Sequence, residues 1–281
     1  MSTARPHSRA ADDSADPRSV VARITRLLAA LASADDEGLS GAEIARKASL
    51  PPATAHRLLV RLEQEGVTVR RAASRSWALG GVVLGWGEAA NRQHVGRSRF
   101  HEVLRAIGQS TKETVVLTVR EGWHGTHVDL VESPTRLRIV EHVGLRLPLT
   151  VGASRRAILA FMPQGERHRV LSRYVPSGAD REWIQRDLEL TRQLGYSVSA
   201  GEVTAYSIGI AVPILTNDTA EASIMVGGPA PRVRVPALRQ ALEVMEQLIR
   251  PRELLPSLAT EKVEDALSLA EERAQRLKFD S

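Results

Sequence analysis

The side chains with the clearest capacity for recognition chemistry lie in the segment 51–62, whose sequence is PPATAHRLLVRL. Its apolar residues recur at the i, i+3, i+4 and i+7 spacing of a helix that buries one face. They are Ala55, Leu58, Leu59 and Leu62. Thr54, Arg57 and Arg61 fall on the other faces, where a hydroxyl and two guanidinium groups can bind phosphates and base edges. The segment therefore predicts a helix that enters the major groove of DNA.

A second group of cations lies in the basic segment 70–75, between short predicted strands at 67–69 and 76–79. Residues 40–80 contain seven Arg or Lys against three acidic residues, so this region carries +4 of the chain's net +5. Such a concentration of positive charge is typical of a surface that binds duplex DNA. The candidate DNA contacts are Ser40, Thr54, His56, Arg57, Arg61, Arg70, Arg71 and Arg75.

The residues before this helix predict the scaffold that positions it. Apolar residues from Val20 to Leu31 recur at helical spacing, and the acidic run 35–38 ends that first helix. Ser40 and Glu43 have the spacing of a capping box at the start of a second, short helix. Helix, helix, turn, helix and basic hairpin together predict a winged helix-turn-helix over 18–80. A small helical unit that mediates protein contacts is the alternative.

Length and composition limit the remaining possibilities. With 281 residues, of which 43% are hydrophobic, the chain is expected to form two domains. The absence of cysteine excludes disulfides, cysteine-based zinc sites and thiol catalysis. No apolar run approaches the ~20 residues that span a bilayer, and no secretory signal is recognisable, so we expect a cytoplasmic protein. Residues 1–17 are polar and are expected to form a disordered arm.

The second half of the chain alternates between helical and strand patterns. Residues 81–98 are expected to form a linker helix that needs a packing partner, because each interior glycine weakens it by ~1 kcal/mol. Predicted helices cover 100–110, 155–161, 182–194 and 236–249, and predicted strands cover 114–119, 127–131, 137–143, 208–215 and 222–226. Antiparallel strands flanked by helices predict an α+β sensor-type domain over 99–250. Residues 251–281 have the spacing of an amphipathic helical extension, expected on the surface.

Several segments between residues 19 and 250, in matching order, resemble the IclR family of bacterial transcriptional regulators. In the first domain the resemblance rests on 43–45 (EIA), 54–59 (TAHRLL) and 62–63 (LE). In the second it rests on 147–149 (LPL), 153–160 (ASRRAILA), 195–197 (GYS), 201–203 (GEV), 210–213 (IAVP) and 227–229 (GGP). The resemblance implies an α+β chain with a winged helix-turn-helix, a linker helix and a GAF-like antiparallel sheet flanked by helices.

The resemblance also implies a function. Family members bind a partly palindromic operator as a dimer or a dimer of dimers, and a small effector, commonly an organic acid or an aromatic compound, controls them. The positions carried over as effector contacts are Ala153, Ser154, Ser199, Gly209, Met225 and Gly227, with Arg155 as a further candidate. Unpaired amides at the start of the helix that contains Ala153 favour an anionic group.

Some effector positions depart from the family pattern. Arg155 stands where the family usually has glycine, Thr150 where it has histidine, and Ser199 where it has an acidic residue. The side chains are thus less suited to a small polar acid, and we expect either a larger, more apolar ligand or weakened effector control. An arginine in the first turn of a helix more often lies in solvent, which is our expectation for Arg155.

Other reactive groups do not predict catalysis. His124 and His127 have a spacing that metal sites use, but no acidic cluster or cysteine lies near them, so we interpret them as incidental members of a turn. We find no activated nucleophile, carboxylate pair or phosphate loop and expect no enzyme and no cofactor. Three functions stay open: an effector-responsive repressor or activator, a constitutive DNA-binding regulator, and a sensor whose winged helix contacts protein.

Overall fold

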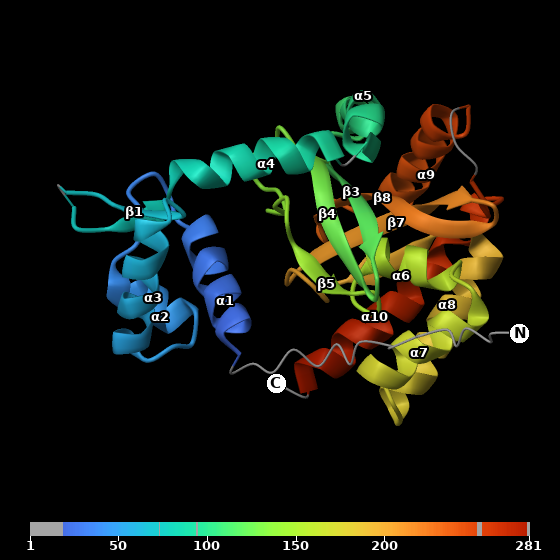
Figure 1. Ribbon diagram of the computed structural model, residues 1–281. Helices are drawn as coiled ribbons and strands as arrows, with labels where there is room; N and C mark the ends of the chain where they lie inside the picture. The colour runs from blue at the N-terminus through green and yellow to red at the C-terminus, as the bar shows by residue number, and fades with distance from the viewer. Residues whose placement is uncertain (1–18, 73, 94, 252–254, 280–281) are drawn as a thin grey trace, which may run out of the picture. The chain divides into compact units, whose positions relative to one another are not determined.

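The computed structural model describes residues 19–72, 74–93, 95–251 and 255–279. The arm predicted for 1–17 lies outside these residues. The chain divides into two compact units, Met1–Gln93 and His94–Ser281. Figure 1 shows the helices and strands of both units, coloured in chain order.

The N-terminal unit combines short helices with a hairpin. Its elements are α1 (Val20–Ala32), α2 (Gly41–Lys47), α3 (Pro52–Gln64), β1 (Thr68–Arg70), β2 (Trp77–Leu79) and α4 (Gly81–Gln93). The apolar stripes of α1, α2 and α3 meet in one core, with Leu27, Ile44 and Leu59 fully buried. The predicted winged helix-turn-helix is confirmed.

Local hydrogen bonds position α3 and the wing. Ser40 Oγ accepts from the Glu43 amide at 3.3 Å, and Glu43 Oε2 accepts from the Ser40 amide at 2.9 Å, which confirms the predicted capping box. Pro52 lies in the first turn of α3, where an amide proton would have no partner in the helix. Leu39 and Trp77 exchange backbone hydrogen bonds of 2.8 and 3.0 Å. The wing is thereby attached to the segment that precedes α2.

Helix α4 has an exposed apolar surface. The described residues of the linker helix predicted over 81–98 are all helical: α4 covers Gly81–Gln93, and α5 (Val95–Thr111) begins before the expected position 100. None of the α4 residues is buried, and Val82, Leu84 and Trp86 are 41%, 74% and 56% exposed.

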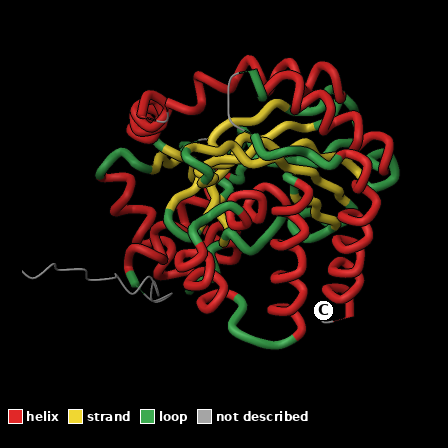
Figure 2. The backbone as a smooth tube through the Cα atoms, turned by 90° about the vertical axis from the view of Figure 1, so that its right-hand side faces the viewer, coloured by secondary structure: helices red, strands yellow, loops and turns green. Residues whose placement is uncertain are grey.

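The C-terminal unit is built on a six-stranded antiparallel sheet in the order β5-β4-β3-β8-β7-β6. The strands are β3 (Thr114–Glu121), β4 (His124–Val131), β5 (Arg146–Pro148), β6 (Ser197–Ala200), β7 (Ser207–Thr216) and β8 (Thr219–Pro229). In the central strand β8, Met225 pairs with Val116 of β3 and with Ala211 of β7. Figure 2 shows the strands between two layers of helices, and the predicted α+β class is confirmed.

Helices cover both faces of this sheet. Helices α5 and α9 (Val235–Ile249) pack on one face, and α6 (Ala153–Ala160) packs on the other, followed by α7 (Gln164–Tyr174) and α8 (Ala179–Leu194). The largest core includes Leu104, Ile210 and Leu242, which are fully buried. Gly195 ends α8 as predicted, with φ +83°, and an added Cβ would lie 2.1 Å from the Ser257 carbonyl oxygen.

The strand predicted over 137–143 is absent. None of these seven residues belongs to a strand, although Ile139 and Glu141 are buried while Leu137 and Val140 are exposed. Thr114 Oγ1 donates to the Ile139 carbonyl at 3.3 Å and helps to hold the segment. The alternating burial explains why the pattern resembles a strand, since an extended segment shows the same period whether or not a neighbour pairs with it.

The described residues 255–279 of the predicted surface extension 251–281 contribute to the C-terminal core. A short 3₁₀ helix, Thr260–Lys262, leads into α10 (Val263–Phe279), which packs against β6, α8 and α9. Its residues in the main core are Val263, Ala266, Leu267 and Ala270. Trp183 Nε1 also donates to the Leu269 carbonyl at 3.1 Å. Amphipathic spacing predicts a buried face but not the surface that covers it. Within the described ranges, no helix has the length and apolar character needed to cross a membrane.

Candidate functional site

The exposed side of α3 and the wing carry the cations predicted to contact DNA. Arg57 and Arg61 lie four residues apart on the exposed face of α3, and Arg75 lies in the β1–β2 loop. Within the described part of the chain, these three guanidinium groups make no hydrogen bond or ion pair. They are therefore available to phosphate oxygens.

Trp77 connects the recognition helix to the wing. Its ring is buried and meets the exposed His56 ring edge-on, with centroids 6.3 Å apart. The Arg70 guanidinium lies over the same ring, 5.8 Å from its centroid. Thr54 is half-buried in the first turn of α3. The sequence pattern placed Trp77 in the returning strand but did not indicate this contact between α3 and the wing.

Two other predicted DNA contacts are already engaged within the unit. The Ser40 hydroxyl lies 2.7 Å from Glu43 Oε2 in the capping box. Arg71 Nη1 donates to the carbonyl of Asp36. Both side chains are exposed, but each must share or exchange an internal hydrogen bond in order to bind DNA, unlike the cations of α3.

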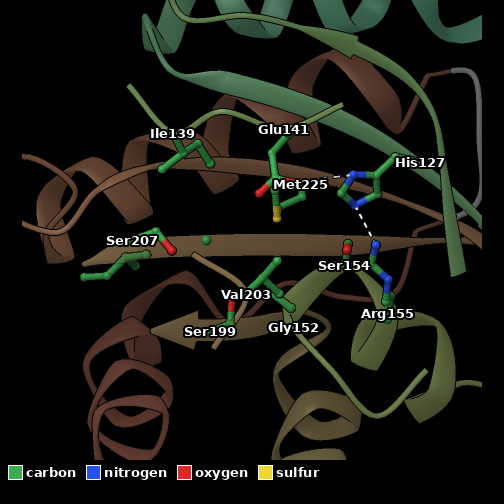
Figure 3. A pocket seen from close by; sticks show the side chains of 13 residues that line it. His127, Ile139, Glu141, Gly152, Ser154, Arg155, Ser199, Val203, Ser207 and Met225 are labelled. Atoms are coloured by element: carbon green, nitrogen blue, oxygen red, sulfur yellow. Dashed lines mark hydrogen bonds and ion pairs between the residues drawn. The ribbon is translucent and has the colours of Figure 1, made fainter. Parts of the chain in front are cut away.

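A small cavity lies in the C-terminal unit between α6, the sheet and two loops (Figure 3). Its volume of about 20 Å³ is enough for one water molecule or one small ligand group. Six of the predicted effector positions line it, namely Ala153, Ser154, Arg155, Ser199, Gly209 and Met225. The seventh, Gly227, is not among the lining residues, but an added Cβ there would come within 2.9 Å of Cδ1 of Ile139, which lines the cavity. The residues that resemblance assigned to the effector are therefore brought together in space.

The first turn of α6 presents unpaired amides at this cavity. Gly152 precedes the helix with φ +78°, and no side chain caps it. The first hydrogen bond of the helix runs from the Arg156 amide to the Gly152 carbonyl, at 3.1 Å. Among the described residues, the amides of Ala153, Ser154 and Arg155 have no acceptor. Because unpaired amides and the helix dipole favour negative charge, this side of the cavity suits a carboxylate.

Arg155 does not lie in solvent, which corrects our expectation. Its side chain is buried, with Nε donating to the Gly125 carbonyl at 3.0 Å and Nη2 donating to the Leu145 carbonyl and to His127 Nε2, each at 3.1 Å. Gly125 makes room for it, since a Cβ there would lie 2.8 Å from Arg155 Cγ. Burial lowers the pKa of Arg155 to about 10, against the opposing effect of Glu141, so the group stays charged at neutral pH. Only the tertiary neighbours of α6 explain this burial.

The two histidines are not incidental members of a turn, as we had interpreted them. Both belong to β4, where His124 Nε2 lies 3.1 Å from the Tyr174 hydroxyl. His127 is 1% exposed and lines the cavity. The sequence signal that could have identified His127 is its position in an alternating strand, three residues after His124 and on the opposite face.

His127 is neutral and has one defined tautomer. Burial, together with the charges of Arg155 and His142, lowers its pKa to about 3. Since a guanidinium can only donate, His127 Nε2 accepts from Arg155 and Nδ1 carries the proton. Nδ1 lies 3.6 Å from Glu141 Oε2, which is too far for a hydrogen bond, and among the described residues it has no hydrogen-bond partner.

The pKa of His127 predicts a pH dependence of stability. The folded imidazole stays neutral while the unfolded one binds a proton below its ordinary pKa of 6.5, so stability is lost as the pH falls below that value. Between pH 7.5 and 5.5 this group should cost about 1.4 kcal/mol. His127→Gln keeps an acceptor for Arg155 and should remove this part of the pH dependence. Urea unfolding of both proteins at both pH values measures this difference. If wild type and His127→Gln lose the same free energy of unfolding between pH 7.5 and 5.5, His127 is not the group responsible.

Arg156 forms a buried ion cluster that the sequence did not indicate. Its Nε lies 2.7 Å from Asp187 Oδ2, its Nη1 lies 2.5 Å from Glu202 Oε2, and its guanidinium carbon lies 4.9 Å from the centroid of Trp183. Burial opposes the charge of Arg156, but the two carboxylates outweigh it and raise the pKa of Arg156. Burial raises the pKa of Asp187 to about 6, although Arg156 acts in the opposite direction. At neutral pH and above, the cluster therefore holds charged partners in direct contact.

The same ion cluster also fixes the loop that forms one wall of the cavity. Glu202 belongs to the loop 201–206 between β6 and β7, and its neighbour Val203 lines the cavity. Glu202 Oε2 accepts from the Gly152 amide at 3.4 Å, next to the start of α6. Arg156 thereby fixes the loop against the helix that presents the unpaired amides.

Both units match models of known protein families. A family model described as the C-terminal part of the bacterial transcriptional regulator IclR matches residues 88–250, and a model of the IclR helix-turn-helix domain matches residues 20–72. A protein of Cupriavidus necator named probable transcriptional regulator SauR is 31% identical over 238 residues, which cover 79% of this chain and 94% of SauR.

Solved structures show the same fold. IclR of Thermotoga maritima has 24% identity and a TM-score of 0.62, over 82% of this chain and 95% of that chain. An IclR homologue of Microbacterium hydrocarbonoxydans, crystallised in complex with 4-hydroxybenzoate, has 26% identity and a TM-score of 0.59, over 83% of this chain and 100% of that chain.

Proposed function

Because this chain belongs to the IclR family of bacterial transcriptional regulators, we propose that it binds a partly palindromic operator and that a small organic effector in the C-terminal cavity controls this binding. The exposed cations of α3 and the wing carry the first part of the proposal. DNA binding implies a cytoplasmic location, where the bacterial chromosome lies. The chain is a regulator of transcription and not an enzyme.

The proposed roles of the DNA contacts follow from their exposure. Thr54 and His56 lie near the start of α3, the end that reaches base edges when such a helix enters a major groove. Arg57 and Arg61 bind phosphates, and Arg70, Arg71 and Arg75 bring the wing to the neighbouring backbone. Ser40, at the start of α2, is placed to contact the backbone through its exposed hydroxyl.

The effector is proposed to be an organic acid whose carboxylate binds the amides at the start of α6. The wall on that side contains Gly152, Ala153 and Ser154, while Met225 and Ile139 supply apolar surface. The complex of the Microbacterium homologue with 4-hydroxybenzoate supports an aromatic acid. At about 20 Å³ the cavity is smaller than such a ligand, so binding requires the loop 201–206 or the segment 137–143 to move outwards.

A thermal-shift screen of organic acids, aromatic compounds and lactones tests the effector proposal. A ligand at 100 times its Kd stabilises the folded chain by about 2.7 kcal/mol, which is easily measured. Stabilisation by a carboxylic acid but not by its methyl ester would support the α6 site. If no acid stabilises the protein, a constitutive regulator is the better description.

We also propose that α4 joins two copies of the chain. Val82, Leu84 and Trp86 are exposed, and an added Cβ at Gly85 or Gly87 would meet nothing within 4 Å. A glycine-containing helix with so little burial gains stability from a partner, and a second copy of α4 supplies a matching surface across a twofold axis. The same contact would set the spacing of two recognition helices on a palindromic site.

Trp86→Glu should weaken this dimer at least about tenfold, because it places a charge in an apolar contact. Leu137→Glu makes a similar change on an exposed apolar residue of the other unit and should leave assembly unaltered. Sedimentation equilibrium of the three proteins measures the difference. Equal dissociation constants would exclude α4 as the dimer contact.

A further inference from the structure

The cavity has a second polar side that none of the predicted effector positions accounts for. His127 reaches it from β4, and Glu141 reaches it from the segment 137–143, as Figure 3 shows. The side chains of His127 and Glu141 are only 1% and 6% exposed. Among the described residues, neither His127 Nδ1 nor the Glu141 carboxylate has a hydrogen-bond partner.

Leaving these groups unpaired is costly in a protein interior. A buried donor or acceptor without a partner loses its hydration and gains nothing in return, and a buried carboxylate loses more than a neutral group. Burial raises the pKa of Glu141, and only the charge of Arg155 opposes this rise. A pair of buried polar groups that face a cavity and lack partners is what a ligand-binding subsite requires.

The two groups together define the chemistry of the partner. His127 Nδ1 carries a proton and must donate, because Nε2 already accepts from Arg155. Glu141 Oε2 faces Nδ1 and can accept. A hydroxyl both accepts and donates, and it can bridge the 3.6 Å between Nδ1 and Oε2 as a third member. A carboxylate has no proton to donate to Glu141, whereas an ammonium has no acceptor for Nδ1–H and would be repelled by Arg155.

We propose that His127 and Glu141 form a hydroxyl-binding subsite, so that the effector is a hydroxycarboxylic acid held by its carboxylate at the start of α6 and by its hydroxyl at this pair. This inference rests on the proposed effector function and adds the second functional group of the ligand. Arg155 acts as a positioning residue: its three hydrogen bonds, including the one to His127, orient the imidazole and fix its tautomer.

The test compares matched ligands on wild-type protein and on variants of Glu141. Benzoate and its three monohydroxy isomers share the carboxylate and the ring and differ in the hydroxyl. Isothermal titration should show at least one hydroxy isomer binding wild type at least about tenfold more tightly than benzoate, equivalent to ~1.4 kcal/mol. A site built to bind a hydroxyl rejects the analogue that lacks it, because its own polar groups then stay unpaired.

Variants of Glu141 should change this preference in a graded way. Glu141→Gln keeps an acceptor without the charge and should reduce the preference for the hydroxy isomer, and Glu141→Met should abolish it while benzoate binding is kept. Glu182→Met, an equivalent change at an exposed position of α8, should keep the wild-type preference. Thermal unfolding of the free variants checks that each one folds before the ligands are compared.

The outcomes separate this inference from the function on which it rests. If benzoate and all hydroxy isomers bind equally well, or if Glu141→Met keeps the preference, the subsite is refuted while the effector function stands. If no acid binds at millimolar concentration, the effector proposal and the subsite fail together.

Discussion

Arg156→Met should lower the free energy of unfolding of the C-terminal unit by about 3–5 kcal/mol, the range found when one partner of a buried ion pair is removed. Methionine fills a similar volume, so the loss arises from charge and not from a large cavity. The variant leaves Asp187 and Glu202, each with a side chain only 6% exposed, without the guanidinium that binds both. This is the largest stability effect that we expect from a single polar substitution.

Arg273→Met is the matched control for this prediction. Its guanidinium lies over the same Trp183 ring, 5.4 Å from the centroid, but it pairs with Asp180, whose side chain is 52% exposed. A pair open to solvent contributes only about 0–1 kcal/mol. Urea unfolding followed by circular dichroism compares the two variants, and equal losses would show that contact with Trp183, not the buried ion cluster, is what matters.

A rescue experiment distinguishes charge from packing. Combining Arg156→Met with Asp187→Leu and Glu202→Met removes both stranded carboxylates, and much of the lost stability should return, because replacing a complete buried ion cluster by apolar groups is often neutral. A triple variant as unstable as the single one would mean that the cluster stabilises the loop 201–206 by geometry that apolar side chains cannot reproduce.

Loss of Arg57 and Arg61 should have the largest effect on DNA binding. Each substitution by alanine removes one phosphate contact and should lower the slope of log affinity against log salt by about one unit per bound protomer. Together they should weaken binding at low salt at least about tenfold, for operator and unrelated duplex alike, because phosphate contacts carry no sequence information. A salt-series titration measures the slope and the affinity.

Arg169→Ala is the control for charge alone. Arg169 is exposed on α7 and, within the described part of the chain, makes no hydrogen bond or ion pair. Its loss changes the net charge as much as the loss of Arg57 does, but it should leave the salt slope unaltered. An equal fall in slope for both variants would point to a diffuse effect of net charge and not to contacts of α3.

The N-terminal unit was predictable because its signals are local. The capping box of Ser40 and Glu43 and the apolar stripe of α3 each depend on residues a few positions apart, and the structure confirms both. The same holds for Gly195, which ends α8 in a left-handed conformation. In these cases the sequence neighbours are also the spatial neighbours.

The features that the sequence misjudged, such as Arg155, or did not indicate, such as the Arg156 cluster, depend on distant partners. Arg155 and Arg156 occupy the first turn of α6, a position that is often exposed, but the acceptors that bury them come from β4, α8 and the loop 201–206. Helix α10 has the spacing of a surface helix and is covered by elements far from it in the chain. A periodic pattern specifies a face, whereas the identity of the covering element is a tertiary property.

For the cavity, too, the sequence identified some of the lining residues but not the tertiary contacts around them. Resemblance to the family identified six of its wall positions, yet it described a pocket poor in polar side chains. The structure adds His127 and Glu141, and together with Arg155 they make one wall strongly polar. The sequence-based expectation of a larger, more apolar ligand or of weakened effector control did not take these polar groups into account.

Selection of genomic fragments by the purified protein, followed by fluorescence anisotropy of the selected duplex across salt, tests the central claim most directly. If two protomers each contribute Arg57, Arg61 and Arg75, they would make six phosphate contacts, so we expect a salt slope of about −5 or steeper. We also expect a shared, partly palindromic site that is bound more tightly than a scrambled duplex. Failure to enrich any common site, together with a slope near zero, would contradict DNA recognition by this winged helix and would favour a protein-contact role.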